Sequence, residues 1–195
     1  MKSPNPKSLF LEKVQDRMVV IAISGKSGCG NTTVTRLLSQ TLGLTMVNYT
    51  FRNLAHDEGI TLQQLLELAQ TDDSFDRKVD EKQVELARKG SCVLGSRLAV
   101  WVYPQADLRV YLKADTRTRV ERIHQREGGD IHQLLRDTEK RDREDHQRYL
   151  DLYGIDNDSF DFVDLVLDAG RMNPNEIVQA IIEKLGEKLG LDAKP

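Results

Sequence analysis

The chain is 195 residues long, which at about 100 to 200 residues per domain predicts a single domain. Its 28 Lys and Arg residues face 31 Asp and Glu residues, and the net charge of -3 argues against binding to nucleic acid or anionic membrane through overall charge. No apolar run approaches the roughly 20 residues that a membrane-spanning helix needs, so we expect no membrane partner.

The two cysteines, Cys29 and Cys92, belong to no CxxC or Cys/His cluster, which favours free thiols in a reducing compartment. Residues 1–17 lack the apolar core of a signal peptide. We therefore expect a cytoplasmic monomer with an N-terminal extension over residues 1–17 and one domain over residues 18–190. The sequence leaves open whether the extension is ordered.

Residues 18–23 form a nearly all-apolar, β-branched run, which predicts a strand buried on both faces of a parallel sheet. Shorter apolar runs follow at residues 45–47, 91–94, 108–112 and 162–167. Helical patterns lie between these runs, including one at residues 32–42. This alternation predicts an α/β fold in three layers, α/β/α, around a five-stranded parallel sheet.

Residues 51–89 are largely helical in pattern and exceed what a plain crossover between parallel strands needs. We interpret this segment as a helical insert over one edge of the sheet, with Thr61 as the N-cap of one helix. Two more helices, at 116–126 and 131–152, are separated by Gly128 and Gly129, a natural hinge. Residues 186–195 are expected to fray after the last helix.

A glycine-rich loop follows the first strand, and its spacing is that of the phosphate loop G-x-x-x-x-G-K-[ST] except at one position. Its backbone N–H groups and the following helix N-terminus predict ATP binding, and the Thr32 hydroxyl is placed to bind Mg²⁺. The predicted ATP contacts in this loop are Gly25, Lys26, Ser27, Gly28, Cys29, Gly30, Asn31, Thr32 and Thr33.

Asn31 occupies the position of the usual loop lysine and carries no charge. Loss of one donor to the transition state costs on the order of 10²- to 10³-fold in rate unless another group compensates. Lys26 lies in the same loop, and we hypothesise that it supplies the missing charge and acts in catalysis. The alternative is a glycine turn that binds no nucleotide.

Several further motifs extend the pattern along the chain. They are Phe51-Arg52-Asn-Leu-Ala55, Phe75-Asp76-Arg77-Lys-Val-Asp80-Glu-Lys-Gln83-Val-Glu-Leu-Ala87, Ser96-Arg97-Leu98-Ala99, Ala106-Asp107-Leu108, Arg119-Val-Glu-Arg122-Ile-His-Gln-Arg126-Glu127 and Arg148-Tyr149-Leu-Asp-Leu-Tyr153-Gly154-Ile155-Asp156. With the loop, they make residues 18–185 resemble the cytidylate kinases, in particular the short group of archaea and some bacteria. The resemblance implies a P-loop nucleoside monophosphate kinase that transfers the γ-phosphoryl group of Mg-ATP to CMP or dCMP. It also implies a monophosphate-binding insert at 51–89 and a lid at 128–152.

Carried onto matching positions, the resemblance implies that Arg52 and Arg97 grip the acceptor monophosphate. It further implies that Asp76, Arg77 and Asp80 frame the nucleoside. Paired guanidiniums suit a dianionic phosphate, and Arg97 follows a strand end, where ligands of open α/β sheets bind. The alternatives are a surface ion pair for each arginine, and a helix-face pair for Arg77 and Asp80.

Arg141, Asp145 and Arg148 lie at i, i+4 and i+7, so one helix face presents two guanidiniums around a carboxylate. In the resemblance this is the lid, whose catalytic arginines Arg141 and Arg148 neutralise charge on the transferring phosphoryl group. A plain solvated helix is the alternative. Arg119 is expected to contact ATP by stacking on its base, with simple solvent exposure as the alternative.

The chain departs from the resemblance at Gly95, where the family carries an acidic residue that helps to organise Mg²⁺ water. This change and Asn31 leave two other functions open. One is a kinase for another nucleotide or a small metabolite, and the other is a nucleotide-binding regulatory protein with little or no turnover. A nucleic-acid binder is disfavoured by the net charge of -3.

Overall fold

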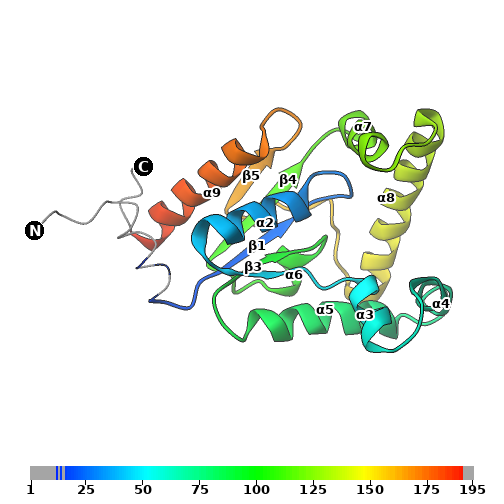
Figure 1. The fold of residues 1–195 in the computed structure, drawn as a ribbon, viewed down its shortest axis with the longest axis horizontal. Helices are drawn as coiled ribbons and strands as arrows, with labels where there is room; N and C mark the ends of the chain where they lie inside the picture. The colour runs from blue at the N-terminus through cyan, green and yellow to red at the C-terminus, as the bar shows by residue number, and fades with distance from the viewer. Residues whose placement is uncertain (1–11, 13, 15, 191–195) are drawn as a thin grey trace, which may run out of the picture.

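The computed structural model describes residues 12, 14 and 16–190. In this part of the chain a five-stranded sheet has the order β2-β3-β1-β4-β5, and every neighbouring pair of strands is parallel. The strands are β1 (Val20–Ser24), β2 (Thr45–Val47), β3 (Cys92–Gly95), β4 (Leu108–Lys113) and β5 (Leu165–Asp168). The predicted α/β class and the five-stranded parallel sheet are confirmed (Figure 1).

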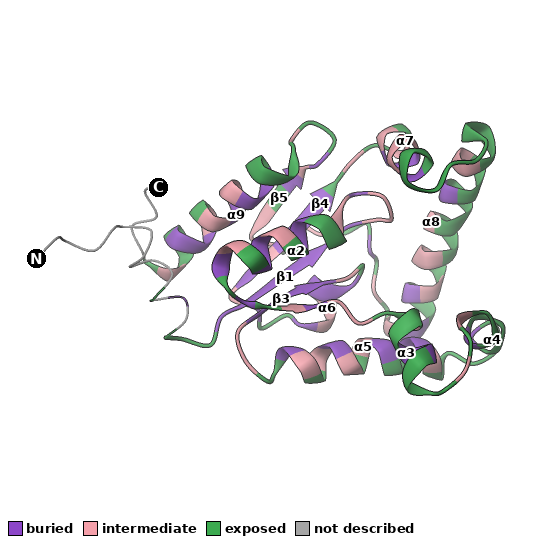
Figure 2. Ribbon diagram, in the orientation of Figure 1, coloured by how far each residue is buried: buried purple, intermediate pink, exposed green. Residues whose placement is uncertain are grey.

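Strand β1 is buried on both faces because helices cover both sides of the sheet. Its residues Ile21 and Ile23 pack in one core cluster with α2 (Asn31–Leu42) and α9 (Pro174–Leu189). Val20 and Ala22 point the other way, into a cluster with the end of α5 (Ser74–Ala87) and with α6 (Ala99–Val102). The period of two along the strand therefore produces the three layers (Figure 2).

The insert has a small core of its own, formed by buried side chains of α3 (Phe51–Asp57), α4 (Leu62–Leu68) and α5. Leu54, Leu65 and Val79 contribute one buried side chain from each helix. Thr61 caps α4 as predicted, since its hydroxyl accepts a hydrogen bond of 3.2 Å from the Gln64 backbone N–H. Helix α5 also packs on β2 and β3, so the insert covers that edge of the sheet.

Helices α7 (Thr116–Glu127) and α8 (Ile131–Tyr153) pack against each other, and α8 stands away from the sheet (Figure 1). The backbone between them passes through Gly128 and Gly129 with φ of 72° and 98°, values that glycine adopts readily. Most of α8 is exposed, and its buried side chains are Thr138, Tyr149 and Leu152. The predicted lid is therefore a helix held at its ends and along one narrow face.

The chain returns from α8 to β5 through residues 154–164, which pack on the sheet through aromatic side chains. Phe160 stacks on Tyr111 of β4 with ring centroids 4.0 Å apart. Trp101 of α6 meets Phe162 edge-on at 5.7 Å and Tyr111 at 6.0 Å. These contacts fix the return segment to the core and identify Trp101 as a packing residue.

The structure adds to the sequence predictions near both ends of the chain. Residues 1–11, 13 and 15 of the predicted extension lie outside the described residues, but Val14 is fully buried in the main core. The prediction of fraying from residue 186 is wrong up to residue 189, because α9 continues to Leu189 and buries Leu185 and Gly186. Within the described part of the chain, no helix combines the length and the apolar character that crossing a membrane requires.

Candidate active site

The phosphate loop connects β1 to α2 and needs glycine at defined positions. Gly28 and Gly30 have φ of 85° and 94°, in the region that favours glycine. A Cβ on Gly25 would lie 2.4 Å from the backbone oxygen of Leu112, so the loop passes too close to β4 for a side chain. The loop leads directly into the N-terminus of α2, and a helix N-terminus is a ready anion-binding site.

Asn31 braces the phosphate loop from within. Its Nδ2 donates a hydrogen bond of 2.7 Å to the Gly25 backbone oxygen, which closes the loop at its base. Its Oδ1 is buried and has no hydrogen-bond partner among the described residues. The side-chain amide of Asn31, at the position of the usual lysine, therefore donates its hydrogen bond to the loop itself.

Lys26 lines the same cavity as the loop glycines, but its amine contacts a carboxylate. Nζ of Lys26 lies 2.6 Å from Oδ1 of Asp158, in the return segment after α8, and 27% of the lysine side chain is exposed. The sequence hypothesis placed this amine on the phosphates, so Lys26 must exchange its partner to serve that role. The flexible four-carbon stem of lysine permits such a move.

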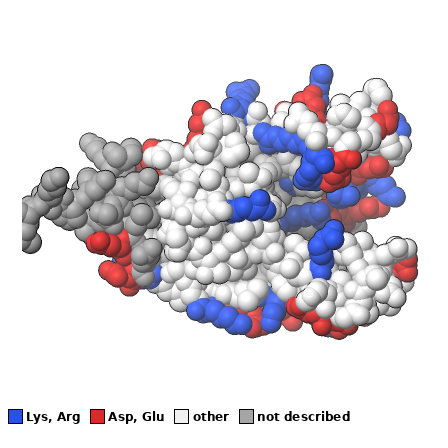
Figure 3. Space-filling view, in the orientation of Figure 1, with Lys and Arg blue, Asp and Glu red and all other residues white. Residues whose placement is uncertain are grey.

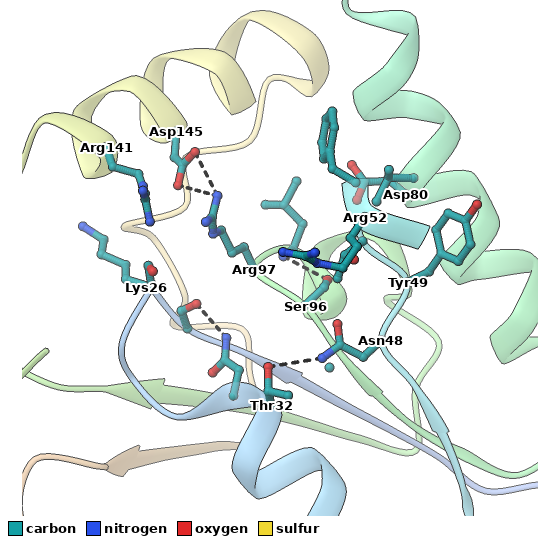
Figure 4. Close-up of a pocket in the computed structure, with 18 of the residues that line it drawn as sticks. Lys26, Thr32, Asn48, Tyr49, Arg52, Asp80, Ser96, Arg97, Arg141 and Asp145 are labelled. Atoms are coloured by element: carbon teal, nitrogen blue, oxygen red, sulfur yellow. Dashed lines mark hydrogen bonds and ion pairs between the residues drawn. The ribbon is translucent and has the colours of Figure 1, made fainter. Parts of the chain in front are cut away.

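The Thr32 hydroxyl has a polar neighbour that the sequence did not indicate. Nδ2 of Asn48, just after β2, donates to Thr32 Oγ1 at 3.2 Å (Figure 4). At the end of β3, a Cβ on Gly95 would lie 2.1 Å from Thr35 Oγ1, so an acidic residue does not fit there. Hydroxyl and amide oxygens suit Mg²⁺, which takes few protein ligands and keeps waters and phosphate oxygens. The site thus fits a nucleotide-bound Mg²⁺ without the acidic residue that the resemblance implies at the position of Gly95.

Arg52 and Arg97 meet in the middle of the cavity. Figure 4 shows both side chains there, with the phosphate loop on one side and Asp80 on the other. Arg97 Nη1 lies 2.9 Å from Asp145 Oδ2 on α8, whereas Arg52 makes no ion pair with any residue that the structure describes. Two guanidiniums from different elements therefore converge, as the sequence predicted for a phosphate site.

The lid helix also contacts the insert through charges. Arg148 Nη1 lies 3.0 Å from Asp76 Oδ2 on α5, and Asp76 is mostly buried. Burial raises the pKa of Asp76 although Arg148 opposes the shift. Burial likewise raises the pKa of Asp145, against the attraction of Arg97, Arg141 and Arg148. These carboxylates are held among arginines that can also bind phosphate.

Asp80 and Arg77 of α5 both contact Tyr153, but only Asp80 lines the main cavity. Asp80 lines the cavity and accepts a hydrogen bond of 2.8 Å from the Tyr153 hydroxyl, and burial raises its pKa to about 6. Arg77 donates to the Leu152 backbone oxygen at 2.9 Å and lies over the Tyr153 ring. The structure therefore brings Asp80 to the predicted site and does not bring Arg77 there, because Arg77 caps the end of α8.

Arg119 is 2% exposed and lies beneath the phosphate loop. Its guanidinium donates to the Ser27 backbone oxygen at 3.1 Å and pairs with Asp142 at 2.6 Å. This burial rules out the alternative of simple solvent exposure for Arg119, and Arg119 is absent from the lining of the main cavity, where the predicted stacking on ATP would place it. The residues of α7 that line the main cavity are instead Arg122 and Arg126.

One cavity of about 1160 Å³ joins these groups. Its walls include the predicted residues Gly25, Lys26, Ser27, Gly28, Gly30, Asn31, Thr32, Thr33, Arg52, Asp76, Asp80, Arg97, Arg141 and Arg148. Cys29 is buried in the core instead, and burial raises the pKa of its thiol. Lys and Arg side chains gather at this hollow, between the α7–α8 side and the α3–α4 side, whereas the surface over α2 is largely uncharged (Figure 3). The cavity is built to hold more than one anionic group.

Among the cavity residues to which the sequence reasoning assigned no role are Gln83 and Asn48. Gln83 lies on the same face of α5 as Asp76 and Asp80, at i+7 and i+3 from them, and this spacing was the available signal. Asn48 follows a strand of only three residues, which gives no pattern strong enough to place a side chain.

Solved structures share the fold. A shikimate kinase from Acinetobacter baumannii, in complex with shikimate, superposes with a TM-score of 0.60 at 16% identity, covering 94% of this chain and 99% of that protein. A deoxyadenosine kinase from M. mycoides with bound dATP superposes with a TM-score of 0.51 at 18% identity, over 88% of this chain and 100% of that one. The chain therefore shares its fold with these two kinases, in agreement with the predicted fold class.

Sequence comparison is more specific. Residues 20–171 match the model of the cytidylate kinase-like family. A protein named cytidylate kinase 2 from Borreliella burgdorferi is 41% identical over 172 residues, which cover 86% of this chain and 96% of that protein. A cytidylate kinase from Pyrococcus abyssi is 36% identical over 176 residues, covering 88% of this chain and 97% of that protein. The chain therefore belongs to the cytidylate kinase-like family.

Proposed function

We propose that the protein transfers the γ-phosphoryl group of ATP to CMP or dCMP, with Mg²⁺, giving ADP and CDP or dCDP. The observation that carries this proposal is the single cavity shared by the phosphate loop and the converging pair Arg52 and Arg97. A phosphoryl transfer between two nucleotides needs both anions side by side, and this cavity brings the two binding groups together. Family membership supports the choice of acceptor.

On the donor side, loop amides and the N-terminus of α2 bind the phosphates of ATP. The Thr32 hydroxyl, oriented by Asn48, binds the magnesium ion. When bound, Mg²⁺ neutralises charge on the phosphate oxygens. Lys26 adds a positive charge after its amine leaves Asp158.

On the acceptor side, Arg52 and Arg97 bind the monophosphate. Arg52 offers its guanidinium without displacing another ion pair among the described residues, and Arg97 has enough N–H groups to bind a phosphate beside Asp145. Asp76 and Asp80 lie on the wall formed by α5, where the nucleoside binds. Arg77 reaches this wall only if its contact with the end of α8 breaks.

Catalysis proceeds by positioning and charge neutralisation, without a covalent intermediate. Arg141 and Arg148 on the lid close over the transferring phosphoryl group, and the Gly128–Gly129 turn gives the lid a hinge. Arg119 acts from below by holding the Ser27 carbonyl, which supports the loop that contacts ATP. One chain lines this cavity without a partner, which supports a monomer as the working unit, and the two free cysteines support a cytoplasmic location.

The test is a coupled ADP-release assay with Mg-ATP and a panel of CMP, dCMP, UMP, AMP and GMP. Turnover restricted to the cytidine acceptors is expected. Turnover of another acceptor in place of CMP and dCMP would show that the proposed substrate is wrong. Tight ATP binding without any turnover would favour a regulatory nucleotide-binding protein.

The same assay on Lys26→Ala tests the relocated charge. We expect kcat to fall on the order of 10²- to 10³-fold, because one donor to the transition state is lost. Asp158→Asn serves as the matched control, since it removes the partner of the ion pair and keeps the amine. Unchanged turnover in Lys26→Ala would refute the role of Lys26.

A further inference from the structure

The acceptor wall of the cavity holds a buried amide that the proposed mechanism does not use. Gln83 of α5 lines the cavity and is only 2% exposed. Its Oε1 is buried without a hydrogen-bond partner among the described residues. A buried acceptor left without a donor costs about 1–3 kcal/mol, so this side chain needs an explanation.

The orientation of this amide is fixed by its other end. Nε2 of Gln83 donates a hydrogen bond of 2.9 Å to the backbone oxygen of Tyr49, at the start of the insert. A backbone carbonyl accepts hydrogen bonds and cannot donate, so turning the amide over would place two oxygens against each other. The group offered to the cavity side is therefore an acceptor.

We propose that Gln83 determines the choice of base by accepting a hydrogen bond, at Oε1, from the 4-amino group of cytosine. Uracil carries an oxygen at the same ring position and would meet Oε1 acceptor to acceptor. This assignment rests on the proposed function, because it concerns the base of the acceptor nucleotide. It makes Gln83 a specificity-determining residue for CMP and dCMP over UMP.

The carboxylates on the same helix face do not supply this discrimination. Asp76 is paired with Arg148, and Asp80 accepts from the Tyr153 hydroxyl. A carboxylate oxygen also accepts from the N3–H of uracil as readily as from the amino group of cytosine. An acceptor with a fixed orientation at the 4-position does separate the two bases.

The surroundings of Gln83 suit a flat pyrimidine ring. Apolar side chains of the insert, Phe51, Leu62 and Val79, line the cavity on the same side. Because Oε1 has almost no accessible surface, this apolar wall has to shift when the base docks against α5. The 4-amino group of the bound cytosine then gives Oε1 of Gln83 its missing hydrogen bond. A polar group in an apolar pocket provides specificity in this way, because a ligand that lacks the partner leaves the group unpaired.

The test combines one substitution with one change to the substrate. Gln83→Met keeps the size of the side chain and removes the amide. The substrates are CMP, UMP and the monophosphate of the pyrimidin-2-one ribonucleoside, which lacks only the 4-amino group. In wild type, kcat/KM for CMP should exceed that for either analogue by about 10- to 100-fold. In Gln83→Met, CMP should lose about the same factor while the pyrimidin-2-one substrate keeps its wild-type value.

The outcomes separate this assignment from a structural role and from failure of the proposed function. An equal loss with all three substrates in Gln83→Met would show that Gln83 only supports the fold, and would overturn the assignment. A wild type that turns over CMP and its pyrimidin-2-one analogue equally well would also overturn it. A wild type that phosphorylates no monophosphate would refute the proposed function and remove the basis of the assignment.

Two controls accompany the kinetics. Gln63→Met changes an exposed glutamine of α4 that does not line the cavity, and it should leave the ratio of CMP to UMP turnover unchanged. Calorimetric titration of CMP and UMP without ATP should show the same loss of preference in binding.

Discussion

The sheet and the lid are held in place by different forces. All five residues of β1 are buried, and apolar side chains surround them on both faces. The 23-residue helix α8 buries three side chains, and its contacts to the rest of the site include the ion pairs Arg97–Asp145, Arg148–Asp76 and Arg119–Asp142. Apolar packing holds one arrangement, whereas ion pairs can exchange one anion for another. The lid, unlike the sheet, is therefore joined to the site largely through charges.

The contrast between sheet and lid is tested most directly by shortening one aliphatic side chain in each of them. Ile21→Ala on β1 removes fully buried methylene and methyl groups and should lower the free energy of unfolding by about 2–5 kcal/mol. Leu150→Ala on α8, where the side chain is 37% exposed, should cost less than about 1 kcal/mol. Denaturant unfolding curves measure both. Equal losses would show that the lid shares the core.

The next effect concerns activity. Arg141 lines the cavity and has no ion-pair partner among the described residues, and its attraction to the buried Asp145 is shared with Arg97 and Arg148, so its removal should cost little stability. Arg141→Ala should reduce kcat by about 10²-fold and leave the melting temperature within a few degrees of wild type. Lys140→Ala removes the neighbouring exposed cation and should leave kcat unchanged. A large fall in the melting temperature of Arg141→Ala would assign this arginine to folding.

The smallest expected effect is on stability and comes from the cluster of Asp164, Arg109 and Lys188 beside β4 and β5. Asp164 accepts hydrogen bonds from the Arg109 backbone and side chain and from Lys188, and these contacts lower its pKa to about 2 although burial opposes them. The folded state then binds fewer protons than the unfolded state, in which the pKa of an aspartate is about 3.9. The stabilisation is present above pH 4 and is lost as the pH falls toward 2.

We expect the contribution of Asp164 to the free energy of unfolding to be about 1 kcal/mol after allowance for solvent screening. The measurement is the difference in unfolding free energy between wild type and Asp164→Asn at several pH values between 5 and 3. That difference should shrink as the pH falls. Asp161→Asn, an exposed carboxylate nearby, should show no such trend, and a constant difference for Asp164→Asn would contradict the assignment.

The same contrast explains what could be predicted from the sequence. The apolar run at residues 18–23 and the glycine spacing after it depend on local chemistry, so strand β1 and the phosphate loop could be recognised in the chain. The partners of the charged residues depend on the fold. Lys26 finds Asp158, and Arg119 finds Asp142, across separations that no local pattern encodes.

Gln83 illustrates the remaining limit. A polar residue on a helix that also carries Asp76 and Asp80 looks like part of a solvated face. Its importance depends on a hydrogen bond to Tyr49, 34 residues earlier, and on an oxygen left without a partner. Neither feature is visible before the helix is placed against the start of the insert.

The aromatic contacts of the return segment have an optical consequence. The chain contains a single tryptophan, Trp101, and its indole ring packs against Phe162 in the segment that leads from the lid back to the sheet. Any displacement of that segment changes the surroundings of this one ring. Tryptophan fluorescence of the unlabelled protein therefore reports on movement of this segment from a position outside the main cavity, with no dye and no second tryptophan to separate.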